Sequence, residues 1–402
     1  MADLIPRNNW SLGINNRAPW RSLPEGSARD IVNLDPMPGG GIALRRGYQQ
    51  VYAGSAVRGA LAVGNYVLIA DGTSLCCYDT TTDSSTVLKT IAGAGRFNGA
   101  VLNDELFFCT ENETLRFKDG VLRTWGVQTA SSHPVPTIVA GGLAAGEYQC
   151  AITFVDAYGD EGGTVSPLLI TVTDDTGLQF TLPTPPEGGF CRLYVGPRQA
   201  STLYLQFEGS GTALITSIDD STARLETLNC RTPVVADFIE AHNAVLLMAD
   251  GAVLWHTDPM HPHLRSPMRG FLQFGASIDG VMSSDGGVFV AADQTFFIAG
   301  LETDQAQQLK VFPHGAVRGT FTRTADNHAA WMTRYGIAKS DGQGGAALLS
   351  ADRFVPEIAA SGQSGLLESN GNQLVVTTMT PSQSGNPLAA ADYYDVEIVP
   401  NE

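Results

Sequence analysis

The chain has 402 residues, a formal net charge of −17 and a hydrophobic content of 43%. A chain of this length and apolar content can bury a sizeable core, which excludes an intrinsically disordered protein. The acidic balance argues against a general nucleic-acid-binding surface, because such a surface needs clustered Lys and Arg. The 44 glycines and 21 prolines, with many Thr, Ser and Val residues, favour strands and turns over helices.

The first residues have neither a basic start nor an apolar core, so we expect no signal peptide. No apolar run approaches the ~18 residues of a membrane span, so none is expected. The six cysteines form no C-x-x-C pair, and we interpret them as buried thiols in a reducing cytosol. A bridge between Cys150 and Cys191 is the alternative. We expect no metal site and no cofactor.

Residues 1–50 read as an extended N-terminal arm. They contain six arginines and four acidic residues, a net charge of +2, so the rest of the chain carries −19. Tryptophan and arginine are the residue types that most often carry interface energy. One interpretation is a floppy terminus, and the one we favour is an arm that docks on a neighbouring subunit. The candidate interface residues are Trp10, Trp20, Arg7, Arg17, Arg21, Arg29, Arg45 and Arg46.

The stretch 33–52 is interpreted as the junction between this arm and a β-repeat body. It runs through three consecutive glycines, Gly39, Gly40 and Gly41, into a short apolar run and then a double arginine. Glycine lets the backbone adopt positive φ and approach other chain segments closely. The run after the glycines predicts an extended strand.

Residues 51–133 predict the first part of a β-propeller. Two apolar runs are separated by Gly64-Asn65, a two-residue hairpin signal, and another run follows Asp71-Gly72. The plan repeats farther on, with turns predicted at Asn103-Asp104 and Asp119-Gly120. Antiparallel meanders at this spacing are typical of propeller blades.

The pattern of strands and turns changes over residues 134–233, and the new pattern predicts an inserted β-sandwich. A long alternating strand precedes an acidic, Gly-rich turn, and later strands recur about every ten residues. The residues that carry a further likeness are Tyr148, Thr153, Tyr158-Gly159-Asp160-Glu161, Leu182-Pro183 and Arg192-Leu193-Tyr194. In their order they resemble a fibronectin type III-like module.

Residues 234–402 predict the second part of the propeller. Turn signals stand at His242-Asn243, Asp250-Gly251, Asp285-Gly286 and Asn370-Gly371. With the units before the insert, the sequence predicts an all-β chain of about six blades, whose closed ring would hide its edge strands. A last strand is expected over 388–399, where it can pair with the first unit.

The sequence carries no motif of a known catalytic class. It has no G-x-S-x-G, no H-E-x-x-H, no P-loop and no Rossmann fingerprint. His256, His261 and His263 lie near Pro259 and Pro262, which predicts solvated histidines on a loop rather than metal ligands. The run 340–344 resembles part of a calcium loop without its terminal Glu, and we interpret it as a hairpin turn.

One motif matches a known family in part. The run Ser283-Ser284-Asp285-Gly286-Gly287 resembles the Asp-box turn of sialidases, with Val290 where that turn has Trp. In that family the box is a structural turn, and catalysis would need an arginine cluster with a Tyr–Glu pair. A propeller glycosidase is therefore an alternative function, while our prediction is that the chain is not an enzyme.

Several short segments together carry a wider resemblance. They are Gly13-Ile14-Asn15-Asn16, Leu23-Pro24-Glu25-Gly26, Asn33-Leu34-Asp35-Pro36, the run 39–48, 288–300 and Pro313-His314-Gly315-Ala316-Val317. They resemble tail-nozzle and DNA-stabilisation proteins of tailed-bacteriophage virions, which are built on a β-propeller with a sandwich-like insert. The resemblance covers nearly the whole chain in plan.

This resemblance implies a structural subunit of the virion tail that assembles in the host cytoplasm. Copies would form a cyclic ring around the DNA passage, as a nozzle, hub or adaptor, with the arm contacting a neighbour or another tail or connector protein. DNA would pass without specific binding. The alternative within structural roles is a tail-tip or fibre-associated protein that recognises the host. Its candidate receptor-contact residues on the insert are Tyr158, Tyr194 and Tyr204.

Overall fold

The computed structural model describes residues 9–37, 39–45, 47–301, 303, 305–350, 352–369, 372–383 and 385–390. Apart from one 3-10 helix, the regular elements of this part are strands, which confirms the all-β prediction. The chain divides into two compact units where the sequence predicted four segments. One unit is Ser55–Phe274, and the other combines Met1–Gly54 with Gly275–Glu402.

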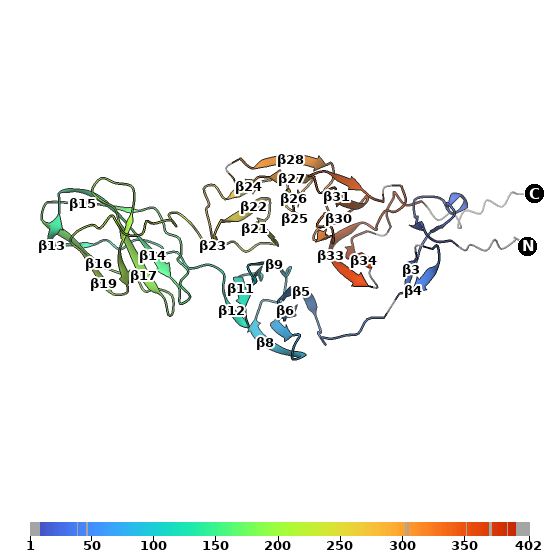
Figure 1. Cartoon of the computed structure of the whole chain (residues 1–402), viewed down its shortest axis with the longest axis horizontal. Coiled ribbons are helices and arrows are strands. Elements are labelled where there is room, and N and C mark those ends of the chain that lie inside the picture. Colours follow the sequence, from blue (N-terminus) through green and yellow to red (C-terminus); the bar gives the residue numbers. More distant parts are fainter. Residues whose placement is uncertain are drawn as a thin grey trace, which may run out of the picture. The chain divides into compact units, whose positions relative to one another are not determined.

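Three antiparallel sheets of the unit Ser55–Phe274 follow the chain as four-stranded meanders, the arrangement of β-propeller blades (Figure 1). In the third sheet a short extra strand, β24, pairs with β22. The strands are β5 (Val57–Val63), β6 (Tyr66–Asp71), β7 (Ser74–Asp79) and β8 (Ser84–Thr90); β9 (Asn98–Leu102), β10 (Glu105–Cys109), β11 (Thr114–Lys118) and β12 (Val121–Thr124); and β20 (Phe238–His242), β21 (Val245–Asp250), β22 (Val253–Asp258), β23 (His261–Arg265) and β24 (Phe271–Gln273).

Two-residue turns set the register of these blades. Gly64 and Asn65 connect β5 to β6, and Gly64 has a φ of +55°. Asn103 and Asp104 connect β9 to β10 with φ of +53° and +59°, the backbone of a type I′ turn. Such turns match the right-handed twist of the flanking strands, so the predicted hairpins are confirmed here.

The central strand β10 is buried on both faces. Leu106 and Phe108 pack with side chains of β6 and β7, including Leu68. Their alternate neighbour Phe107 packs instead with the sheet β20–β22, beside Met248. Because side chains of a strand alternate between its faces, a continuous apolar run suits a strand placed between two sheets. Blade-on-blade packing therefore explains this run.

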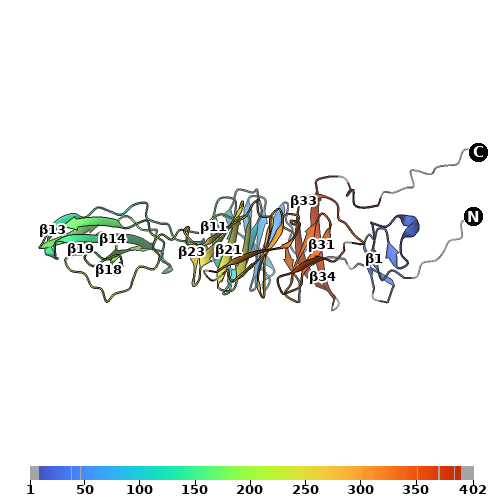
Figure 2. The ribbon, with the colours of Figure 1, turned by 90° about the horizontal axis from the view of Figure 1, so that it is seen from above.

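The insert is a β-sandwich of a three-stranded and a four-stranded sheet, shown in green in Figures 1 and 2. The sheet orders are β13-β16-β19 and β15-β14-β17-β18. Ile152, Leu178 and Leu193 are fully buried in its core. The strands are β13 (Thr137–Leu143), β14 (Gly146–Val155), β15 (Leu168–Val172), β16 (Thr176–Thr181), β17 (Phe190–Val195), β18 (Tyr204–Gly209) and β19 (Thr212–Ile215).

The second unit contains two further four-stranded blades. Trp331 is buried between them, with its ring stacked on Phe321 at a centroid distance of 4.9 Å and packed near Phe289. In both sheets the strands lie in chain order. The first strand of the second sheet, β29, has only two residues. Their strands are β25 (Gly280–Ser284), β26 (Gly287–Ala291), β27 (Thr295–Ala299), β28 (Gln307–Phe312), β29 (Thr322–Arg323), β30 (Ala329–Thr333), β31 (Gly336–Ser340) and β32 (Ala346–Leu348).

The sixth predicted unit is a two-stranded hairpin rather than a four-stranded blade, so the described residues form five blades. Its strands are β33 (Ala359–Ser369) and β34 (Asn372–Pro381). The predicted turn at Asn370-Gly371 and most of the strand expected over 388–399 lie outside the described residues. The arm carries short elements of its own: β1 (Gly13–Ile14), η1 (Trp20–Ser22), β2 (Ser27–Ala28), β3 (Leu34–Pro36) and β4 (Ile42–Leu44).

Candidate interaction sites

The N-terminal arm is tied to its own chain by side-chain and backbone hydrogen bonds of Asn16. The Asn16 side chain donates to the Val355 carbonyl at 2.7 Å and accepts from the Val355 N–H at 3.0 Å. The backbone N–H of Asn16 also donates to the Arg353 carbonyl, and its carbonyl accepts from the N–H of Ala390. The arm from Trp10 to Arg45 is therefore folded against the unit that contains Gly275–Glu402. The sequence predicted an extended segment here.

The predicted interface residues of the arm divide into three groups. Trp20 is 50% exposed, with the Arg21 guanidinium 5.4 Å from the centre of its ring, whereas Trp10 is half-buried. Arg29 donates to the Ala18 carbonyl, Arg45 pairs with Asp35 on the surface, and Arg17 is exposed. Arg7 and Arg46 lie outside the described residues. The structure thus brings Trp20 and Arg21 together but does not gather all eight residues into one patch.

The hairpin β3–β4 has one ionic and one apolar face. Arg45 and Asp35 form a 2.8 Å ion pair on the first. Leu34 is paired with Leu44, and Ile42 lies two residues from Leu44, so these three share the second. Leu44 is 81% exposed there and Ile42 36%. Exposed apolar groups also continue beyond β4, at Tyr48 and Val51.

The hairpin β33–β34 exposes apolar residues on both faces. Leu366 and Val375 are directly paired and therefore share one face. Leu367 and Leu374 form the next pair and share the other face with Val376. All five side chains are between 38% and 44% exposed.

The three candidate receptor-contact tyrosines do not form an exposed cluster. Tyr158 is 60% exposed, with the Arg123 guanidinium 4.5 Å from its ring centre, and Tyr204 is half-buried. Tyr194 is only 2% exposed, so the prediction that it contacts a receptor is wrong. Tyr194 points from β17 to the outer face of its sheet, but a chain segment that includes Leu203 covers this face.

Tyr194 belongs to a partly buried network around Glu161. Its hydroxyl and that of Thr153 donate to one carboxylate oxygen of Glu161, at 2.7 and 2.5 Å. Arg192 donates to the other oxygen at 2.7 Å and also pairs with Glu208. Burial, together with the charge of Glu161, raises the pKa of Tyr194. This shift is opposite to the one that would activate a tyrosine as a nucleophile.

A second network joins the loop after β14 to the sheet β9–β12. The Arg116 side chain, on β11, is 4% exposed and pairs with Asp160 of the loop. Asp156, at the other end of the loop, and Glu105 of β10 each lie 3.7 Å from the guanidinium. Arg123 completes the cluster with an ion pair to Glu105 at 2.9 Å. The acidic turn that the sequence indicated therefore fastens the sandwich to a blade.

The prediction of solvated histidines on a loop is wrong. His256 lies in β22, while His261 and His263 lie in β23, which pairs with β22 through Asp258–His261. The His263 side chain is buried, and its Nε2 lies 3.0 Å from the Glu161 carbonyl oxygen. Burial lowers the pKa of His263 and outweighs the opposing effect of Asp160; Arg116 and His261 lower it further.

Metal and disulfide chemistry find no support in the described part of the chain. It contains no group of three or more His, Cys, Asp or Glu side chains placed to hold a metal ion. All six cysteines are free and buried, so Cys150 and Cys191 do not form a bridge. Burial raises the pKa of Cys109, Cys150 and Cys230 to about 12. No helix among these residues is long and apolar enough to cross a membrane.

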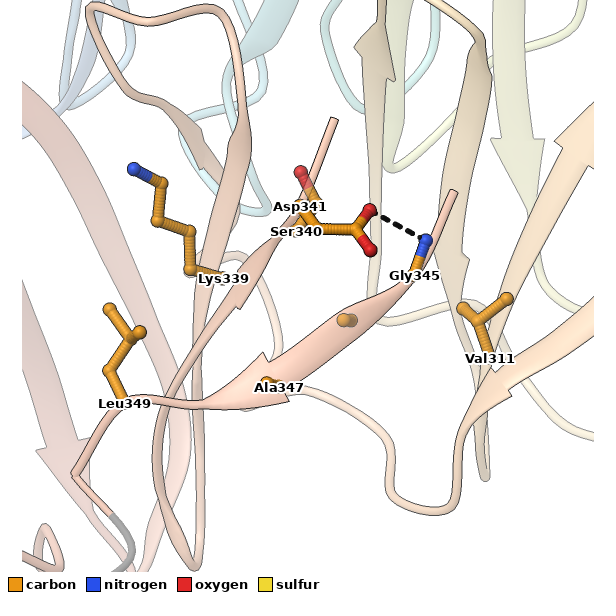
Figure 3. A pocket seen from close by; sticks show the side chains of 8 residues that line it. Val311, Lys339, Ser340, Asp341, Gly345, Ala347 and Leu349 are labelled. Carbon is orange, nitrogen blue, oxygen red and sulfur yellow. Dashed lines mark hydrogen bonds between the residues drawn. The ribbon is translucent and has the colours of Figure 1, made fainter. Parts of the chain in front are cut away.

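An open hollow of about 400 Å³ lies beside the turn that resembled a calcium loop (Figure 3). Its charged groups are already engaged. Asp341 accepts the N–H groups of Gln343 and Gly345, which lower its pKa, and the Lys339 ammonium pairs with Asp326 at 2.7 Å. The loop is a hairpin connection between β31 and β32, as predicted.

No protein-family model and no curated protein sequence matches this chain. Among solved structures, BBS1N in complex with ARL6DN is similar over 85% of this chain and 98% of its own, with 10% identity and a TM-score of 0.33. A catalytically inactive virginiamycin B lyase from Staphylococcus aureus with quinupristin is similar over 80% of this chain and 92% of its own, with 9% identity and a TM-score of 0.34. The N-terminal domain of Nup159 is similar over 81% of this chain and 73% of its own, with 10% identity and a TM-score of 0.31. At these scores the similarity carries no argument about function.

Proposed function

We propose that this all-β propeller protein is a structural subunit of a tailed-phage virion. Several copies assemble into a ring that forms part of the tail around the DNA passage. The observation that carries the proposal is the concentration of exposed apolar side chains on the arm. They are Leu12, Trp20, Val32, Met37, Ile42, Leu44 and Tyr48, and the exposed Val51 follows directly after the arm. A folded appendage that leaves these groups in water needs a partner surface.

The charge distribution supports the same role. The arm region carries +2 and the rest of the chain −19, so an arm is attracted to the body of a neighbour. Acidic groups lining a passage would also keep DNA from adhering, since like charges repel within a Debye length of ~8–10 Å. Other tail or connector proteins are further partners for the arm.

The features expected of the two alternatives lack support among the described residues. Host recognition through the insert called for clustered exposed tyrosines, but Tyr194 is buried. A glycosidase called for an arginine cluster with a Tyr–Glu pair, and the pair Tyr194–Glu161, in which the tyrosine hydroxyl donates to the carboxylate, lies in the sandwich. The Asp-box-like turn connects β25 to β26.

The ring is tested on the purified full chain by light scattering and negative-stain electron microscopy across a concentration series. We expect a closed oligomer, weakened by Trp20→Ala and by Leu44→Asp. The matched control is Val87→Asp, a change at a 66% exposed position on β8, which should leave assembly intact. A monomer at every concentration, or equal effects of all three variants, would contradict the proposal.

A further inference from the structure

The hairpin β33–β34 has apolar side chains on both faces that the described part of the chain leaves exposed. At its base, the Gly362 N–H donates to the Arg318 carbonyl at 2.8 Å, which anchors this end beside the blade β29–β32. Toward the tip, the paired residues Leu366–Val375 and Leu367–Leu374 expose apolar groups on opposite faces. A two-stranded hairpin is at best marginally stable in water, and strands that are apolar on both faces are typically covered on both.

The hairpin β3–β4 also exposes apolar side chains, on one of its two faces. It pairs three residues with three, too few to be stable alone, and on its apolar face Ile42 and Leu44 are exposed beside the half-buried Leu34. Its other face carries the exposed ion pair of Arg45 and Asp35. The apolar face is therefore the one suited to an apolar partner surface.

Charge favours a second copy of this chain at the hairpin β33–β34. From Ala359 to Pro381 the sequence holds a single charged residue, Glu368, although the whole chain carries −17. This hairpin is thus a surface where two copies can meet without strong repulsion between like charges. A partner from the arm, which has net positive charge, also avoids placing two Glu368 carboxylates together, as contact between two such hairpins would.

We infer that the apolar face of β3–β4 in one copy packs on the hairpin β33–β34 of the next copy. This inference rests on the proposed ring and names the contact that builds it. One interface covers the apolar face of β3–β4 and the face of β33–β34 that carries Leu366 and Val375. Because the two surfaces differ, the contact is heterologous and repeats from copy to copy, which generates a ring when the rotation closes. Self-pairing of β33–β34 would instead stop at a dimer and leave β3–β4 exposed.

Disulfide trapping between two full-length variants tests the contact. Leu44→Cys and Val375→Cys chains are mixed in equal amounts at a concentration where the wild-type chain assembles, and are then mildly oxidised. Both positions are exposed, so the variants should fold and assemble, which light scattering checks. We expect a covalent dimer containing one chain of each kind, because only side chains held within about 4 Å at Cβ form a disulfide readily. Val87→Cys mixed with Val375→Cys is the control and should give at least tenfold less.

The outcomes separate this inference from the proposed function. A wild-type ring without the mixed dimer overturns the contact and leaves the ring standing. A dominant dimer of Val375→Cys with itself also overturns the contact, because it indicates that β33–β34 pairs with itself. A wild-type chain that stays monomeric at every concentration overturns both. A mixed dimer that is well above the control supports both.

Discussion

Replacing Arg116 with alanine should release the loop between Asp156 and Asp160 from the blade β9–β12. The guanidinium is 4% exposed and lies 3.7 Å from both Asp156 and Glu105. At an effective dielectric constant of about 20, one pair of unit charges at this separation is worth roughly 4.5 kcal/mol before desolvation. Deleting one partner of a buried ion pair costs ~3–5 kcal/mol. Here Asp156 and Asp160 lose their cation, whereas Glu105 keeps Arg123, so we expect the low end of this range.

The assay is hydrogen exchange followed by mass spectrometry on peptides that span the loop. Since 1.36 kcal/mol is a factor of ten, a loss of ~3 kcal/mol raises local opening on the order of 100-fold. Lys89→Ala is the matched control, because Lys89 pairs with Glu113 at 2.7 Å in the same unit but at an exposed site worth ~0–1 kcal/mol. Equal protection of the loop in the two variants would refute the reasoning.

Three further predictions concern buried polar groups. Tyr194→Phe removes a hydrogen bond to a carboxylate and should cost ~1.5–3 kcal/mol in urea unfolding, whereas the exposed Tyr158→Phe should cost almost nothing; equal costs would count against the partly buried network. Because burial lowers the pKa of His263, the unfolded chain alone gains this proton as the pH falls below about 6.5. The free energy of unfolding should therefore fall below that pH, and less so in His263→Gln; identical pH profiles would contradict this. Burial raises the pKa of Cys109 to about 12, so the native chain should react with a thiol reagent at pH 8 only after unfolding, and rapid native labelling would argue against a buried thiol.

Turn residues and apolar runs in the sequence were sufficient to predict the all-β fold class. Asn103-Asp104 has the residues that a two-residue turn requires, and its positive φ values follow from that chemistry. The apolar run of β10 indicated a strand but not which of its faces meets which blade. That assignment depends on contacts with Met248, which lies far along the chain.

The misread segments are those where tertiary contacts override local preference. Pro262 suggested a loop, yet His261–Arg265 is a strand, and the Pro262 carbonyl accepts the indole N–H of Trp125 at 2.6 Å. Proline is tolerated because this short strand lies at the edge of its sheet, where a missing N–H costs little. The alternation of histidines at 261 and 263 was the available signal for a strand.

The ionic networks and the two-faced hairpin were not predictable in detail. Arg116 and Asp160 are 44 residues apart in the chain, and nothing in the local pattern links a blade strand to a turn of the insert. The acidic composition of that turn was visible, but its partner was not. Likewise, the apolar residues of β33–β34 indicated a buried blade, and only the packing of the folded chain shows that they remain exposed.

The proposed role in a phage tail is tested most directly by an image of the virion with this subunit labelled. The label should appear as a ring of several copies around the tail axis, with the arm of each copy against its neighbour. A label that is absent from the particle, or that occurs as single copies at the outer ends of fibres, would contradict a structural role around the DNA passage.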